Sequence, residues 1–170
     1  MLITRKWAMP DSNTFSIKPI KELIEKYIKN KEYIIDPFVR NSPFKHLCLS
    51  NDIDKNIKAD YNIDALDFLK NQKGKFELCL FDPPYSPRQV SECYKNNSFA
   101  VNMQTTQASF WSNIKKEISR ITEVNGYCIS CGWNSGGIGI KNGFKIIEIL
   151  LVAHGGWHND TIVVVEQKIK

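Results

Sequence analysis

An acid, two prolines and an aromatic ring follow a short apolar run in the middle of the chain. Leu78–Phe81 predicts a buried strand, and Asp82-Pro83-Pro84-Tyr85 comes directly after it. Because proline continues neither a strand ladder nor a helix interior, the strand is expected to end at Asp82. The carboxylate and a freed carbonyl can accept hydrogens from a flat, polar-edged ligand while the ring stacks on its face. The spacing predicts a ligand-binding corner at the strand's carboxyl end, the edge at which open α/β sheets bind ligands.

Three further acids stand where predicted strands end. Asp36 and Asp52 follow apolar runs, and Asp64 follows the strand-like start of the segment Ala59–Lys70. A single acid at such a place is usually a turn former or a helix cap. Four strand-end acids in one parallel sheet would meet at its ligand-binding edge, which favours a shared site.

Strands and helices alternate along most of the chain. Helical spacing of apolar residues predicts helices at Pro19–Lys29 and Thr105–Ile121 and a short helix within Ala59–Lys70. The predicted strands are Tyr33–Ile35, Lys45–Leu49, Phe76–Phe81, Gly126–Cys131, Phe144–Val152 and Thr161–Gln167. This order predicts an α/β fold with a mostly parallel sheet flanked by helices and a C-terminal antiparallel hairpin. The polar segment Ser86–Thr106 is longer than an ordinary connection, which is typical of binding loops.

Composition narrows the class of protein. The 170 residues are 42% hydrophobic and 24% charged, as expected for a globular domain, and the net charge of +5 permits a polyanionic partner. The chain shows no signal peptide and no apolar stretch long enough to span a membrane, so we expect no membrane partner and a cytoplasmic location. Five cysteines, an odd number, argue against a disulfide framework. Cys128 and Cys131 match a CxxC spacing, but residues three apart in a strand face opposite sides, so we expect buried thiols and no metal site.

With these motifs in place, the chain resembles the S-adenosylmethionine-dependent DNA adenine (N-6) methyltransferases with an Asp-Pro-Pro-Tyr motif. Asp36-Pro37-Phe38 resembles the first cofactor motif of that family, and Asn51-Asp52-Ile53-Asp54 resembles its second. Asn62–Leu69 is similar to the third, and Thr14–Pro19 to the motif beside the methionine part of the cofactor. The resemblance covers nearly the whole chain and extends to small methylases of phages and mobile elements. It implies a Rossmann-like class I fold with residues 1–170 as a single catalytic domain. Because the sequence ends at Lys170, directly after the predicted hairpin, we expect no separate target-recognition domain.

The family motif implies the catalytic residues. Asp82 and the Pro83 carbonyl would accept the two hydrogens of an adenine amino group, next to the rigid corner at Pro84. Tyr85 would stack on the base. Two interpretations stay open for the substrate contacts: Arg88 binds phosphate or is a solvated arginine, and Trp157 and His158 lie near a flipped base or form a polar turn.

S-adenosylmethionine is the implied cofactor. Asp52 would hold the ribose hydroxyls, and Asp64 would accept from the amino group of the cofactor's adenine. The other implied cofactor-binding residues surround the amino-acid part or the adenine face: Phe15, Ser16, Lys18, Asp36, Phe38 and Ile53. Lys18 would pair with the cofactor carboxylate or stand in solvent before a helix.

The chain departs from the family pattern in its first motif. Residues 39–42, Val-Arg-Asn-Ser, carry no glycine where the family has glycines after Asp-Pro-Phe. Asn41 is expected to take the left-handed conformation instead, because asparagine adopts it at modest cost. Arg40 would add a polar contact that glycine cannot make.

Several functions remain open from the sequence. The first expectation is methyl transfer to adenine in DNA, since relatives that methylate RNA bases or protein amides generally have Asn in place of Asp82. The alternatives are such an RNA or amide methyltransferase, or a cofactor- or nucleic-acid-binding module without catalysis. DNA is the expected partner in a prokaryotic or phage-infected cell, and a homodimer is left open.

Overall fold

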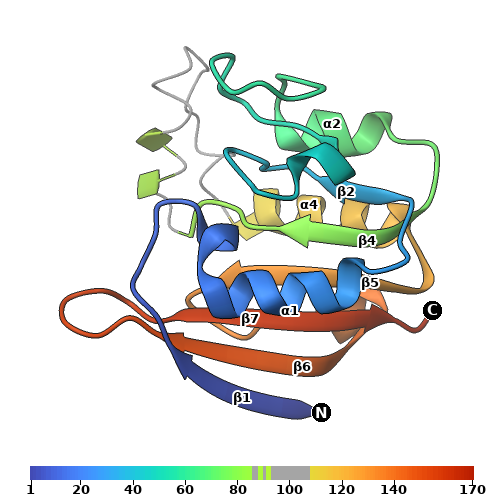
Figure 1. The fold of residues 1–170 in the computed structure, drawn as a ribbon. Coiled ribbons are helices and arrows are strands. Elements are labelled where there is room, and N and C mark those ends of the chain that lie inside the picture. The colour runs from blue at the N-terminus through green and yellow to red at the C-terminus, as the bar shows by residue number, and fades with distance from the viewer. Residues whose placement is uncertain (86–87, 90, 93–107) are drawn as a thin grey trace.

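The computed structural model describes residues 1–85, 88–89, 91–92 and 108–170. Seven strands of these residues form one sheet with the order β1-β6-β7-β5-β4-β2-β3 (Figure 1). The strands are β1 Leu2–Trp7, β2 Ile34–Asp36, β3 Leu49–Ser50, β4 Phe76–Phe81, β5 Thr122–Gly132, β6 Phe144–Ala153 and β7 Thr161–Lys168. Every paired neighbour is parallel except β7, which is antiparallel to β5 and β6. The predicted mostly parallel sheet with a C-terminal hairpin is therefore confirmed.

Strand β4 shows why the middle of the sheet is buried. Leu78 and Leu80 pack into one hydrophobic cluster, whereas Cys79 and Phe81 pack into the other. Side chains of a strand point alternately to its two faces, so a strand covered on both sides is apolar throughout. The two-sided burial of this apolar run holds Asp82 at the end of a rigid element.

Helices cover both faces of the sheet. Helix α1, Lys18–Ile28, packs Ile20, Leu23 and Ile24 on one face. Helices α2, Ala65–Asn71, and α4, Ala108–Ile121, cover the other (Figure 1). Ile114, Ile118 and Ile121 of α4 are buried, at the spacing of one face of a helix. Among the described residues, no helix is long and apolar enough to cross a membrane.

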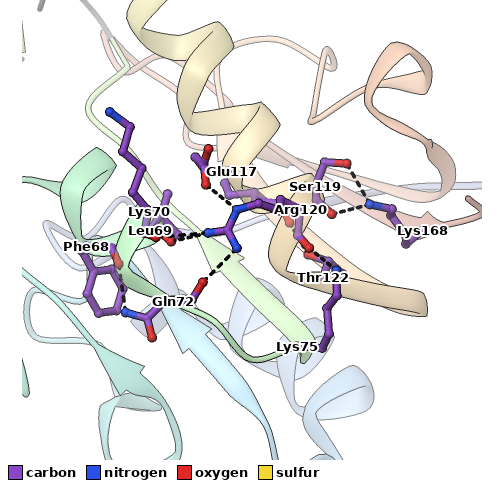
Figure 2. A network of polar contacts seen from close by, with 11 residues as sticks. Phe68, Leu69, Lys70, Gln72, Lys75, Glu117, Ser119, Arg120, Thr122 and Lys168 are labelled. Carbon is purple, nitrogen blue, oxygen red and sulfur yellow. Dashed lines mark hydrogen bonds and ion pairs between the residues drawn. The ribbon is translucent and has the colours of Figure 1, made fainter.

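Arg120 joins the two helices on the second face (Figure 2). Its guanidinium donates to the carbonyls of Leu69 and Gln72, each at 2.9 Å, at the C-terminal end of α2. The last carbonyls of a helix lack their usual partners four residues on. The Leu69 carbonyl accepts from the Gln72 N–H at 3.1 Å, and Arg120 adds a donor from α4. The contact fixes α2 against α4 beside the segment that leads into β4.

The predicted strand Lys45–Leu49 is wrong over most of its length. Lys45–Leu47 form a 3₁₀ turn, and only Leu49–Ser50 pair with β2. Phe44 and Cys48 are both buried, and their four-residue spacing suits a helical turn, whereas Leu47 is exposed. Packing of one turn into the core therefore overrides the apolar run as a strand signal.

Strand β1 was not predicted. It is a mostly exposed edge strand that runs parallel to β6, with Leu2 opposite Glu148. The strand expected at the start of Ala59–Lys70 is reduced to one bridge between Asn51 and Tyr61. Three short 3₁₀ turns complete the described elements: Thr14–Ser16, Lys45–Leu47 and Ile140–Asn142. Most of the predicted loop Ser86–Thr106, and residues 105–107 of the predicted helix, lie outside the described residues.

Candidate active site

The site lies where the order of the sheet reverses. From β2 the chain moves outward to β3 and then returns to form β4 on the other side of β2. Adjacent parallel strands that lead away in opposite directions leave a crevice at their carboxyl ends. Asp36 ends β2 and Asp82 follows β4, so this reversal brings the first and last of the four predicted acids to the same edge.

A cavity of about 450 Å³ opens at this edge, within the usual range for a small-molecule site. Seven of the predicted site residues line it: Phe38, Asp52, Ile53, Asp82, Pro83, Pro84 and Tyr85. They come from three separate segments of the chain, after β2, after β3 and after β4. The structure thus brings the predicted catalytic motif and part of the predicted cofactor pocket into one cavity.

The Asp82 carboxylate is held by a short chain of hydroxyl groups. The Tyr85 hydroxyl donates to Asp82 Oδ1, and Thr14 Oγ1 lies 3.4 Å from the same hydroxyl. Burial raises the pKa of Asp82, and hydrogen bonds from Tyr85 and Thr14 together with the charge of Arg40 offset part of the rise. Thr14 belongs to the predicted N-terminal motif, so the tip of that segment contacts Tyr85 at the predicted catalytic corner.

Tyr85 packs its ring against Trp133, which follows β5. The ring centroids lie 5.6 Å apart with an interplanar angle of 68°. This edge-on geometry is a favourable aromatic arrangement. It fixes the Tyr85 side chain from the direction of β5 while its hydroxyl faces Asp82.

Asp52 is positioned by backbone donors. Its Oδ1 accepts from the Asp54 N–H and its Oδ2 from the Arg40 N–H, both at 2.9 Å. Burial raises the pKa of Asp52, and these two hydrogen bonds lower it in part. Because a carboxylate offers about four acceptor positions, lone pairs remain for a diol in the cavity. Asp52 therefore suits the ribose-binding role that the resemblance implies.

Asp36 is fully buried, and Pro37 and Phe38, which follow it in the chain, line the cavity. Its Oδ1 accepts from the Phe38 N–H at 3.0 Å, whereas Oδ2 is buried without a hydrogen-bond partner among the described residues. Burial raises the pKa of Asp36 well above its usual range, and the charges of Asp82 and Asp52 add to the rise. A buried acceptor that lacks a protein partner is typical of a place where a ligand or water donates.

In the loop after β2, which has no glycine, the left-handed conformation occurs at a different residue from the predicted one. Arg40, not Asn41, has the positive φ, at 42°. The N–H of Arg40 donates to Asp52, and this hydrogen bond fixes the backbone at that point. The expectation for Asn41 is thus wrong, because the position of the turn is set by the contact with the following strand end.

Other predicted residues lie away from the lining of the cavity. Asp64 caps α2 by accepting from the N–H groups of Leu66 at 2.8 Å and Asp67 at 3.3 Å. Phe15 is buried in the core next to α1, while Ser16 and Lys18 are exposed. A strand-end acid can bind a ligand or cap a helix, and the hydrogen bonds of Asp64 are those of a helix N-cap.

The predicted substrate contacts are also outside the lining. Trp157 is fully exposed and His158 is exposed. Both belong to the loop of residues 154–160, which connects β6 to β7 (Figure 1). Arg88 is exposed and pairs with Glu92 at 2.8 Å. His154 in the same loop is buried, with Nδ1 2.9 Å from the Ala8 carbonyl and Nε2 2.8 Å from the Thr161 hydroxyl. A carbonyl only accepts, so His154 donates from Nδ1 and serves to anchor the hairpin.

Sequence reasoning missed an aromatic wall of the cavity. Phe110 and Trp111, from the start of α4, line it together with Phe38. The Phe38 and Trp111 centroids lie 6.4 Å apart. The adjacent aromatics at the start of the predicted helix are a signal in the sequence, but helical spacing by itself does not show that Trp111 faces a cavity.

The predicted burial of Cys128 and Cys131 on opposite sides of a strand is confirmed. Cys128 packs in the cluster under α2 and α4, and Cys131 packs in the cluster under α1. Both are free thiols on opposite faces of β5. Their side chains therefore do not converge on one ligand.

The sequence matches no family model and no curated protein. Solved structures with a similar fold include the N-methyltransferase NodS from Bradyrhizobium japonicum WM9, with a TM-score of 0.63 and 9% identity over 95% of this chain and 100% of that one. SMU.1697c from Streptococcus mutans, in complex with SAH, has a TM-score of 0.54 and 15% sequence identity, over 88% of this chain and 97% of that one. An rRNA methylase from Streptococcus thermophilus has a TM-score of 0.53 and 10% sequence identity, over 88% of this chain and 94% of that one. The chain has the Rossmann-like fold of class I methyltransferases.

Proposed function

We propose that this protein transfers a methyl group from S-adenosylmethionine to the exocyclic amino group of adenine in DNA. The observation that carries the proposal is the Asp82-Pro83-Pro84-Tyr85 corner at the end of β4, which lines the same cavity as Asp52. The methyltransferase fold supports the reaction class, and the complex of SMU.1697c with SAH supports the cofactor.

The residues around the cavity suit this cofactor. Asp52 has acceptor capacity for two ribose hydroxyls, and Ile53 and Phe38 offer apolar surface in the lining. Asp36, which precedes Pro37 and Phe38 in the chain, holds an unused buried acceptor. When bound, S-adenosylmethionine would supply a methyl group on a positively charged sulfur. The amino nitrogen would form a bond to the methyl carbon while the bond from that carbon to sulfur breaks, S-adenosylhomocysteine would leave, and the methylated nitrogen would lose one proton.

The catalytic corner would activate a poor nucleophile. The lone pair of an adenine amino group is delocalised into the ring, so acceptors on its two hydrogens favour the tetrahedral form with a directed lone pair. Asp82 and the Pro83 carbonyl would supply these acceptors, and the negative charge of Asp82 faces the positive charge that develops on nitrogen. Holding both reactants in this geometry supplies much of the rate acceleration.

A base in duplex DNA must leave the stack before it reaches such a cavity, at a cost of a few kcal/mol. Stacking of the flipped base on the Tyr85 ring would offset this cost by roughly 1–3 kcal/mol. Trp157, His158 and Arg88 are exposed and offer stacking and phosphate contacts outside the cavity. Three exposed side chains offer few contacts to base edges, so we expect a short or relaxed recognition sequence.

Methylation assays on purified protein test the proposal. Labelled S-adenosylmethionine is offered with random-sequence single-stranded DNA, duplex DNA and RNA, and the modified positions are mapped. We expect N6-methyladenine in DNA with little sequence context. Methylated RNA, or methylated protein in a lysate, would assign the same chemistry to another substrate, and cofactor binding without transfer would indicate a non-catalytic module.

The variant Asp82→Ala separates chemistry from binding. We expect the transfer rate to fall by at least about a hundredfold, because a preorganised group that contacts the reacting nitrogen is lost. Cofactor binding should remain measurable by calorimetry. Asp67→Ala, an exposed acid on α2, is the matched control and should keep full activity. Full activity of Asp82→Ala would contradict the catalytic assignment.

A further inference from the structure

Arg40 gives the cavity an unusual charge arrangement. Four acids line the cavity in the described part of the chain: Asp52, Asp54, Asp82 and Glu92. Arg40 is the single lysine, arginine or histidine among those described lining residues. Its guanidinium makes no ion pair or hydrogen bond with any residue that the structure describes, so its donors remain available to a ligand.

The backbone at Arg40 is held in a costly conformation. A φ of 42° is unfavourable for a residue with a side chain, a penalty that glycine avoids. The hydrogen bond from its N–H to Asp52 Oδ2 keeps the residue in place. Strained backbone that the surroundings hold in place is often part of a functional site. Here the strain places a long cationic side chain in the cavity lining.

The charge of Arg40 acts on the acids at both ends of the proposed site. It lowers the pKa values of Asp52 and Asp82, although burial raises both overall. Asp52 already receives two backbone N–H groups, and Asp82 receives the Tyr85 hydroxyl. The guanidinium therefore stands within electrostatic reach of the ribose-binding acid and of the catalytic acid without being bonded to either.

Resting on the proposed function, we propose that the Arg40 guanidinium binds the carboxylate of the cofactor's amino-acid arm. The sulfur of the cofactor carries the ribose, the methyl group and the amino-acid arm. With the ribose at Asp52 and the methyl group directed toward Asp82, the arm would start between these two acids. A planar guanidinium matches a carboxylate with two parallel hydrogen bonds. Lys18, the residue that the resemblance suggested for this contact, is exposed and does not line the cavity. Arg40 is thus a cofactor-positioning residue where the family has a glycine.

Titration calorimetry with two ligands tests this inference. S-adenosylhomocysteine carries the carboxylate, and its decarboxylated form, S-adenosyl-3-thiopropylamine, lacks only that group. We expect the wild type to bind S-adenosylhomocysteine the more tightly of the two. Arg40→Gln should weaken S-adenosylhomocysteine binding by about tenfold to a hundredfold, the size of a hydrogen bond to a charged group, and leave the amine's affinity unchanged. Gln keeps a side chain at the strained position, and Arg40→Lys should recover part of the loss.

The controls separate this inference from the proposed function. Arg5→Gln on the exposed edge strand β1 removes the same charge elsewhere and should change neither affinity. Equal weakening of both ligands, or of neither, by Arg40→Gln would overturn the carboxylate contact while leaving the cofactor assignment intact. A loss of DNA affinity with unchanged S-adenosylhomocysteine binding would assign Arg40 to phosphate instead. Failure of the wild type to bind either ligand would overturn the cofactor assignment itself.

Discussion

At the scale of single residues, the proposed catalysis depends on the protonation state of Asp82. Burial raises the pKa of its carboxyl, and the Tyr85 hydroxyl stabilises the ionised form by donating to it. Only the ionised form places a full negative charge opposite the developing positive charge on nitrogen. The activity is therefore expected to fall on the acid side at a pH above the usual range of an aspartate.

Tyr85→Phe tests this coupling. Removing the hydroxyl removes a hydrogen bond to the charged form, so the pKa of Asp82 rises further and the ionised fraction at a given acidic pH falls. We expect the acid limb of the kcat/KM profile to move to higher pH, while the ring remains to stack on a base. The measurement is the pH dependence of methyl transfer.

Tyr33→Phe is the matched control, because Tyr33 is 62% exposed and lies before β2. Its acid limb should coincide with that of the wild type. An acid limb in Tyr85→Phe that also coincides with the wild type would show that the Tyr85 hydroxyl does not tune Asp82 in solution.

At the scale of elements, the connection from β5 to β6 has a 3₁₀ turn, Ile140–Asn142, and no α-helix. Glu166 on β7 fixes this connection, because its buried carboxylate accepts hydrogen bonds from the N–H groups of Ile138 and, at 2.9 Å, Gly139. Gly137 has a φ of 49°, and a Cβ at this position would stand 2.3 Å from Glu166 Oε2. A tight backbone approach thus takes the place of a packed helix.

Gly137→Ala should destabilise the fold. The left-handed conformation alone costs an alanine about 1–2 kcal/mol, and the contact with Glu166 requires an additional shift of buried backbone or carboxylate. We expect the free energy of unfolding in urea to fall by at least that amount. The loss should also loosen Trp133, which begins the same connection and packs on Tyr85.

Gly74→Ala is the control, because a Cβ there would meet no atom within 4 Å and its φ is not positive. Its stability should equal or slightly exceed that of the wild type. Equal unfolding free energies for both variants would mean that the connection does not depend on close approach to Glu166.

At the scale of the whole molecule, cofactor binding should stabilise the fold. The cavity is built by segments after β2, β3 and β4, so a ligand there binds only the folded chain. At one hundred times its dissociation constant, S-adenosylhomocysteine should add about 2.7 kcal/mol. For a domain of this length that corresponds to a rise in Tm of roughly 5–11 °C, measured by calorimetry.

Two variants make the thermal shift specific. Asp52→Ala should reduce the shift because the ribose acceptor is lost, whereas Asp67→Ala should keep it. A wild-type Tm that is unchanged at saturating S-adenosylhomocysteine would contradict the cofactor assignment. A full shift in Asp52→Ala would leave the cofactor in place and remove Asp52 from its site.

The sequence by itself determined the features that depend on local pattern. Apolar runs ended by prolines or acids located β2 and β4, and helical spacing located the buried faces of α1 and α4. The alternation of strand side chains placed Cys128 and Cys131 on opposite faces. These signals are reliable because they rest on backbone periods and on the missing N–H of proline.

Only the tertiary structure decided which residues meet. It gave the left-handed turn to Arg40 instead of Asn41, used Asp64 as a helix cap, and joined Thr14 to Tyr85 and Asp82. Each outcome depends on a contact between segments far apart in the chain, such as the N–H of Arg40 on the carboxylate of Asp52. A strand-end acid has the same local sequence whether it caps a helix or faces a cavity. The packing of the sheet around its reversal point therefore determines its role.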